Sequence, residues 1–155
     1  MDDEGTHRIV HLAFVQDFRN IRVWHDARAL RARIYELVAT FPGHERRGLS
    51  DQLRRSARSI GANIAEGFGE SSRWDCARCV QISIGEAGET LSHLYDALDL
   101  HYISQEQFDA VASELCVLRR RIGALYFKVR PSGNGRRREP VRRRRRRQSG
   151  RDSDG

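Results

Sequence analysis

Long apolar segments are missing from this 155-residue chain. No stretch of about eighteen apolar residues occurs, so the sequence predicts no membrane-spanning helix and no membrane partner. The run from Ile9 to Val15 is short and interrupted by His11, and it follows an acidic start, whereas a signal peptide begins with basic residues. We therefore expect a cytoplasmic protein.

Cysteine is also scarce, and its three copies do not form a recognisable site. An odd number of thiols without an extracellular context favours reduced cysteines. Cys76 and Cys79 form a C-x-x-C pair, but no predicted strand precedes it, as a thioredoxin-like motif would require. Cys116 is expected roughly 14 Å from Cys79 along a helical hairpin, too far to share a zinc ion. We predict core packing for Cys76 and Cys79, and no metal site.

Patterns that carry catalysis are absent too. The six histidines show neither an H-x-x-x-H nor an H-x-x-E-H spacing, and His44 with Glu45 is predicted to be a solvated pair in a loop. No glycine-rich phosphate loop follows a strand, because the glycines at 67 and 69 are expected in a turn between helices. No Ser–His–Asp or paired-carboxylate arrangement has a pocket. The sequence predicts a non-enzymatic protein without a cofactor.

What the chain does contain is helical periodicity, with apolar residues recurring three or four positions apart. Pro42 and the glycines at 67 and 69 are read as stop signals, while Ser72 and Ser104 are typical N-caps. Short connections between long helices favour antiparallel neighbours. We predict an all-α, up-down-up-down antiparallel four-helix bundle. Its helices are predicted near residues 21–41, 46–66, 72–100 and 104–129.

Basic charge is confined to one end of the chain. Residues 128–155 hold twelve basic and three acidic residues, a net charge of +9, whereas residues 1–127 hold sixteen arginines and eighteen acids, a net charge of −2. Only one of the 28 basic residues is lysine, so the arginine content is also compatible with a compositional bias. We predict an N-terminal extension (1–17), a bundle domain (18–130) and a disordered basic tail (131–155).

Two groups of residues are candidates for binding. Partly buried carboxylates need hydrogen-bond or cationic partners, and Asn63, Glu66 and Glu89 lie beside predicted core positions. We predict that they form a structural polar network, with a partner site as the alternative. The second group consists of tail arginines that could bind nucleic-acid phosphates. These are Arg136, Arg137, Arg138, Arg142, Arg143, Arg144, Arg145, Arg146 and Arg147.

Several sequence blocks together resemble one known family. The most specific is Asn63-Ile64-Ala65-Glu66-Gly67, which matches an N-I-A-E-G block. The others are Val23–Ala27, Thr40–Pro42, Glu45–Leu49, Gln52–Ile60 and Leu100–Ser104, the last with His101 in place of a glycine. With these blocks, the segment from Phe18 to Val129 resembles the four-helix-bundle family named for intervening sequences in 23S ribosomal RNA genes.

The resemblance implies a homopentamer. A similar fold serves as the accessory protein of diversity-generating retroelements, which binds a reverse transcriptase and nucleic acid. Two functions stay open at this point. The first is a binding module associated with RNA or a ribonucleoprotein partner. The alternative is a structural or protein–protein assembly module that does not bind nucleic acid directly.

Overall fold

The computed structural model describes residues 17–70 and 72–131, and these residues are helical throughout apart from short connections. Two short 3-10 helices, η1 (Phe18–Asn20) and η2 (Gly43–Arg47), precede the first and second long helices. No strand occurs within the described ranges, which confirms the predicted all-α fold. Residues 1–16 and the predicted disordered tail from residue 132 onward lie outside the described residues. The four long helices are α2 (Arg22–Val38), α3 (Leu49–Gly69), α4 (Arg73–Asp99) and α5 (Gln105–Val129).

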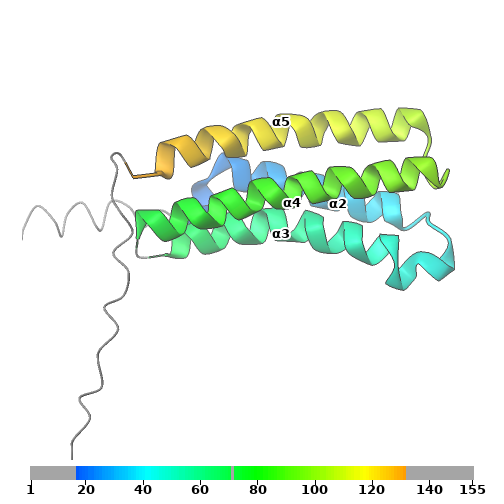
Figure 1. Ribbon diagram of the computed structural model, residues 1–155, viewed down its shortest axis with the longest axis horizontal. Helices are drawn as coiled ribbons and strands as arrows, with labels where there is room; N and C mark the ends of the chain where they lie inside the picture. The colour runs from blue at the N-terminus through cyan, green and yellow to red at the C-terminus, as the bar shows by residue number, and fades with distance from the viewer. Residues whose placement is uncertain (1–16, 71, 132–155) are drawn as a thin grey trace, which may run out of the picture.

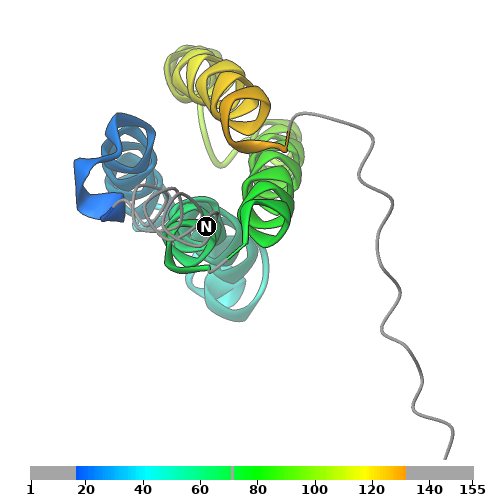
Figure 2. The same ribbon diagram turned by 90° about the vertical axis from the view of Figure 1, so that its left-hand side faces the viewer.

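The four long helices run antiparallel in chain order (Figure 1). Seen along the bundle, α3 lies between α2 and α4, and α4 lies between α3 and α5 (Figure 2). The most extensive packing joins α3 to α4, and the least extensive among neighbouring long helices joins α2 to α5. This arrangement confirms the predicted up-down-up-down bundle. Within the described part of the chain, no helix is long and apolar enough to cross a membrane.

The core is built from the apolar stripes that the sequence predicts. Each stripe places one apolar residue per turn toward the bundle axis, and burying a large aliphatic side chain stabilises the fold by about 1.5–3 kcal/mol. The largest apolar side chains that are almost fully buried are Ile34, Leu53, Ile60, Ile64, Val80, Leu94, Leu115 and Ile122.

Small polar side chains are buried where α3 meets α4. The Ser83 hydroxyl donates to the Ile60 carbonyl oxygen at 2.8 Å, and the Thr90 hydroxyl lies 2.9 Å from Ser56 Oγ. Ser56, Ser83 and Thr90 are all at most 1% exposed. Because these side chains are short and hydrogen-bonded, they let the two helices approach closely without leaving a buried hydroxyl unpaired.

The seam between α2 and α5 is closed differently, by ion pairs at the surface. Arg121 Nη1 lies 2.7 Å from Asp26 Oδ2, and Arg33 pairs with Glu114. Two hollows of about 840 and 300 Å³ flank the Asp26–Arg121 pair. Since exposed ion pairs stabilise proteins little, this seam is held more weakly than the contact between α3 and α4.

The predicted end of the first helix at residue 41 is wrong by three residues. α2 ends at Val38, because the Thr40 hydroxyl donates to the Leu37 carbonyl (2.8 Å) and Phe41 N–H donates to the Val38 carbonyl (3.2 Å). These short-range bonds replace the helical ladder ahead of Pro42, which disfavours helix at the residue before it. The next helix begins at Leu49 rather than 46, because η2 occupies residues 43–47.

The predicted turn at the glycines 67 and 69 is also wrong, since α3 continues through Gly69. Phe68 is only 6% exposed and packs in the core, which favours helix over a turn here. A Cβ atom on Gly67 would lie 3.1 Å from both the Cys76 carbonyl oxygen and Cys79 Cβ. This glycine therefore serves close helix packing and does not end the helix.

The Glu45 side chain is hydrogen-bonded at one end of the bundle and is not free in solvent. The prediction that His44 and Glu45 form a solvated pair is therefore wrong as well. The Leu49 N–H donates to Glu45 Oε2 (2.8 Å) and the Tyr102 hydroxyl donates to Glu45 Oε1 (3.0 Å). These bonds join the α2–α3 connection to the α4–α5 turn. Hydrogen bonds from Leu49 N–H and Tyr102 lower the pKa of Glu45 below its ordinary value of 4.5.

We expect Glu45→Gln to destabilise the protein in a pH-dependent way. A carboxylate whose pKa is lowered by folding stabilises the native state above its unfolded pKa, and the effect is lost as the pH falls through the folded pKa. The difference in unfolding free energy between the parent and Glu45→Gln is therefore expected at neutral pH and shrinks below pH 4.5. Denaturant unfolding across a pH series measures it. Tyr102→Phe, which removes one of the two bonds, should show the same trend with a smaller amplitude, whereas a pH-independent difference would contradict the prediction.

His101 carries backbone strain that a glycine would relieve. Its φ is 58°, and it occupies the left-handed position of a Schellman motif, in which Tyr102 N–H donates to the Ala97 carbonyl. A residue with a side chain in this region costs roughly 1–2 kcal/mol of stability. Replacing it with glycine removes this strain, but part of the gain is lost because glycine raises the conformational entropy of the unfolded chain. We expect His101→Gly to stabilise the protein by about 0.5–1 kcal/mol in denaturant unfolding. His101→Ala keeps the Cβ and serves as control; equal stability of the two variants would contradict the strain argument.

Candidate functional site

An exposed aromatic and basic surface lies where α4 begins and α5 ends. Trp74 is 55% exposed and Phe127 is 64% exposed, which is unusual for large apolar side chains. Arg78 and Arg130 are exposed beside them, and we call these four residues the Trp74–Phe127 surface. An open hollow of about 610 Å³ lies between them. Its lining consists of Trp74, Ala77, Arg78, Gln81, Tyr126, Phe127, Arg130 and Pro131.

Hydrogen bonds hold the two helix ends of this surface together. The Arg73 guanidinium donates to the Val129 carbonyl at 3.3 Å and to the Lys128 carbonyl at 3.2 Å. The last carbonyls of a helix lack partners within the helix and favour a positive charge, so this contact ties the start of α4 to the end of α5. Ser72 caps α4 by accepting from the Asp75 N–H.

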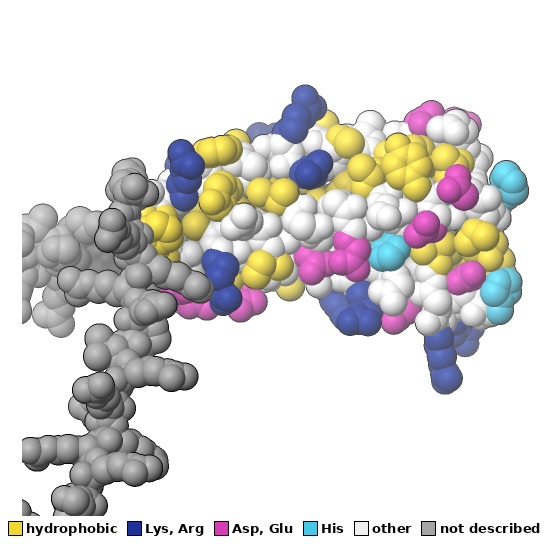
Figure 3. Space-filling model, in the orientation of Figure 1, with side chains coloured by type: hydrophobic (Ala, Val, Ile, Leu, Met, Phe, Trp, Pro, Cys, Tyr) yellow, Lys and Arg dark blue, Asp and Glu magenta, His cyan; other side chains and the backbone are white. Residues whose placement is uncertain are grey.

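The aromatic rings of the surface are available to a flat ligand. Arg130 lies 4.6 Å from the centroid of the Phe127 ring, within the range of a cation–π contact. In the space-filling view, hydrophobic side chains form a band over α4 and α5, and basic side chains interrupt it toward the end where α5 finishes (Figure 3). Such a surface can stack planar groups and pair with nearby anions.

Sequence reasoning missed Trp74 and Phe127. Phe127 lies outside the apolar stripe that contains Ile122, Leu125 and Val129, so its helical phase already indicated exposure. Trp74 lies in the first turn of α4, again off the stripe. The predicted tail arginines, Arg136–Arg138 and Arg142–Arg147, lie outside the described residues. The last described residue, Pro131, lines the hollow, so the following residues are attached to the bundle at this surface.

The structure separates the three residues of the predicted polar network. The Asn63 side-chain amide donates to the Ser59 carbonyl of its own helix at 2.8 Å. Glu89 is exposed and lies 3.5 Å from His93 Nε2, whereas Glu66 lies near Cys79. Among the described residues, no hydrogen bond or ion pair joins Asn63, Glu66 and Glu89 to one another. The buried polar contacts between α3 and α4 are instead made by the serine and threonine hydroxyls described above.

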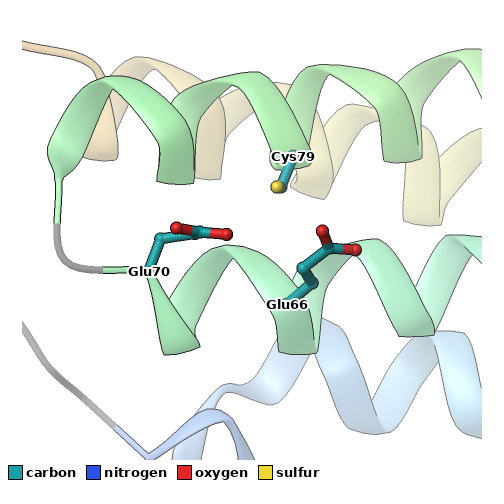
Figure 4. A group of neighbouring side chains, drawn as sticks. All are labelled: Glu66, Glu70 and Cys79. Atoms are coloured by element: carbon teal, nitrogen blue, oxygen red, sulfur yellow. The ribbon is translucent and has the colours of Figure 1, made fainter.

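A second group of side chains gathers near the α3–α4 connection. One carboxylate oxygen each from Glu66 and Glu70 and the Cys79 sulfur all lie within 4.8 Å of one another (Figure 4). Glu66 lies near the end of α3, Glu70 directly follows this helix, and Cys79 faces them from α4. The prediction of no metal site rested on the spacings of the cysteines and histidines, which do not include this mixed group.

Cys76 and Cys79 are at most 1% exposed, which confirms their predicted place in the core. Burial raises the pKa of Cys76 to about 11, with a smaller contribution from Cys79. Burial, followed by the charges of Glu66 and Glu70, also raises the pKa of Cys79. Since the thiolate is the nucleophile, neither thiol by itself is suited to covalent catalysis at neutral pH. Cys116 is exposed.

Comparison with known proteins gives a family and a structural relative. The family model described as 23S rRNA-intervening sequence protein matches residues 19–124. A crystal structure of a protein with unknown function from the S23 ribosomal protein family of Bacteroides thetaiotaomicron is similar, with 26% sequence identity and a TM-score of 0.61. The match covers 67% of this chain and 97% of that one. No curated protein matches.

Proposed function

Because the chain belongs to the 23S rRNA-intervening sequence protein family, we propose that it is a non-enzymatic binding module that associates with RNA. The observation that carries the proposal is the Trp74–Phe127 surface, with two exposed aromatic rings flanked by Arg78 and Arg130. The three free cysteines suit a reducing compartment, and we place the protein in the cytoplasm.

The residue types on this surface match the needs of unpaired RNA. Exposed bases of single strands stack on aromatic rings, and each such contact contributes about 1–3 kcal/mol. Arginines nearby pair with phosphates and stack on bases as well. Trp74 and Phe127 supply the rings, and Arg78 and Arg130 supply the charges within the same hollow.

The position at which the basic tail is attached also supports the proposal of RNA binding. The segment after Pro131 carries most of the +9 charge of residues 128–155, and it begins at the hollow itself. Arginines that neutralise phosphates release counterions, which gives affinity without sequence preference. A tail tethered beside the aromatic surface raises the local concentration of any RNA it holds. We infer that the tail captures RNA and that the Trp74–Phe127 surface contacts its bases.

We expect Trp74→Ala and Phe127→Ala each to weaken binding of a single-stranded RNA by about 1 kcal/mol or more, roughly fivefold in Kd. Truncation after Pro131 is expected to reduce the salt dependence of binding, because it removes the tail's phosphate contacts. Fluorescence anisotropy across a salt series measures both effects.

Tyr95→Ala is the matched control, since Tyr95 is also an exposed aromatic of α4, at 51%, but does not line the hollow. It should leave RNA binding unchanged. Failure of the full chain to bind RNA near physiological salt would refute the proposal. Binding that survives both aromatic substitutions but disappears with the tail would restrict RNA contact to the tail.

Self-assembly is the second candidate function, and it is favoured by the outward face of α4. Ile82 is 42% exposed on this face, and Gly85 and Gly88 have open space where a side chain would be. An apolar side chain beside glycines permits close approach of another helix. We propose a homo-oligomer, with five copies as the family resemblance implies.

We expect sedimentation equilibrium to give a particle several times heavier than the 17.8 kDa chain. Ile82→Glu should shift the particle toward the monomer, because a charge cannot be buried unpaired in an apolar contact. Leu100→Glu changes a similarly exposed apolar residue at the bundle end and should leave the mass unchanged. A monomeric parent chain at micromolar concentration would exclude the assembly.

A further inference from the structure

Three potential metal ligands converge between the end of α3 and the second turn of α4. Glu66 lies near the end of α3 and Glu70 is the extended residue that follows it, and both carboxylates point toward α4 (Figure 4). Cys79 points toward them from α4, and one donor atom from each residue lies within 4.8 Å of the other two. The close approach of the helices at Gly67, where a Cβ would lie 3.1 Å from Cys79 Cβ, fixes this geometry.

The Cys79 thiol is a separate sign that the group has a ligand. Its residue is 1% exposed, and within the described residues its sulfur has no hydrogen-bond partner. Figure 4 shows that the sulfur points toward the space between the two carboxylates. A buried free thiol ordinarily packs as a small apolar group; this one faces two carboxylates, an arrangement that a bound ion would explain.

The two carboxylates lack a partner as well. Two carboxylates this close to each other repel, and no ion pair or hydrogen bond of the described residues engages either the Glu66 or the Glu70 carboxylate. A cation between them would reverse this repulsion, and it would be held from both helices at once.

We propose that Glu66, Glu70 and Cys79 bind a divalent transition-metal ion, with zinc as the preferred ion. The ligand atoms favour zinc, because zinc binds both thiolate sulfur and carboxylate oxygen, whereas magnesium and calcium bind oxygen ligands. Ligand atoms around a tetrahedral zinc lie about 3.5 Å apart, so the glutamate side chains need only small rotations. Glu66 is exposed, which leaves a fourth position open to water.

The ion would act as a clamp on the α3–α4 hairpin. Glu66 belongs to the last turns of α3, Glu70 directly follows this helix, and Cys79 lies in the second turn of α4. Metal binding to residues of both helices stabilises the folded state by mass action, since the unfolded chain does not hold the three ligands together. The proposal does not depend on RNA binding.

Zinc titration of the reduced full chain, in competition with a chromophoric chelator, tests the site. We expect the full chain to bind one zinc ion. Glu66→Gln, Glu70→Gln and Cys79→Ala should each weaken the affinity for zinc by at least about tenfold. Cadmium should give a thiolate charge-transfer absorption that Cys79→Ala abolishes. Magnesium and calcium should not compete.

Cys76→Ala is the matched control, because Cys76 is equally buried one turn earlier on α4 but is not a member of the group. It should keep both the zinc affinity and the cadmium absorption. Circular dichroism checks that each variant remains helical, and the two glutamine variants keep the test valid if Cys79→Ala fails to fold. A full chain that binds no zinc, or equal zinc affinity in the parent and the two glutamine variants, would overturn the proposal.

Discussion

The close contact between α3 and α4 is the interaction on which the other features of the molecule depend. Gly67 permits it, since any larger residue would meet the Cys76 carbonyl and Cys79 Cβ at 3.1 Å. Ser83 and Thr90 extend it by bridging the helices with short hydrogen bonds. α4 in turn packs against α5 and contains the exposed Trp74. The same α3–α4 contact brings Cys79 close to the carboxylates of Glu66 and Glu70.

The fold could be predicted because one physical signal, the apolar stripe, repeats on all four helices. Leu53, Ile60 and Ile64 are buried where their periodicity places them. Helix ends were less predictable, because they depend on contacts between residues that are distant in sequence. Glu45 is bonded to Tyr102, 57 positions away, and this bond belongs to the turn arrangement and not to any local pattern. Likewise, Phe68 is helical because it reaches the core, although two glycines flank it.

The candidate sites, like the fold, have features that the sequence predicts and features that depend on tertiary contacts. The helical phase of Phe127 and the one-turn spacing of Glu66 and Glu70 can be read from the sequence. What cannot be read is which helix ends meet, because this depends on the relative register of neighbouring helices. Without that register, Cys79 could be compared only with the other cysteines, and the mixed group stayed hidden. The buried hydroxyls of α3 and α4 were similarly hard to predict. Serine and threonine look like polar interruptions of an apolar stripe in the sequence, but in the folded protein they are buried and hydrogen-bonded between the two helices.

Net charge is a poor guide to where an anionic partner such as the proposed RNA would contact this protein. Residues 1–127 carry a net charge of −2, which by itself argues against attraction of a polyanion to the bundle. Screening confines the effect of exposed charges to about 8–10 Å at physiological salt, so the groups around each surface matter more than the total. Arg78 and Arg130 flank the exposed rings at the very end from which the basic segment departs. Local composition, together with the attachment of the basic segment at Pro131, thus makes the proposed RNA contact compatible with a bundle of negative net charge.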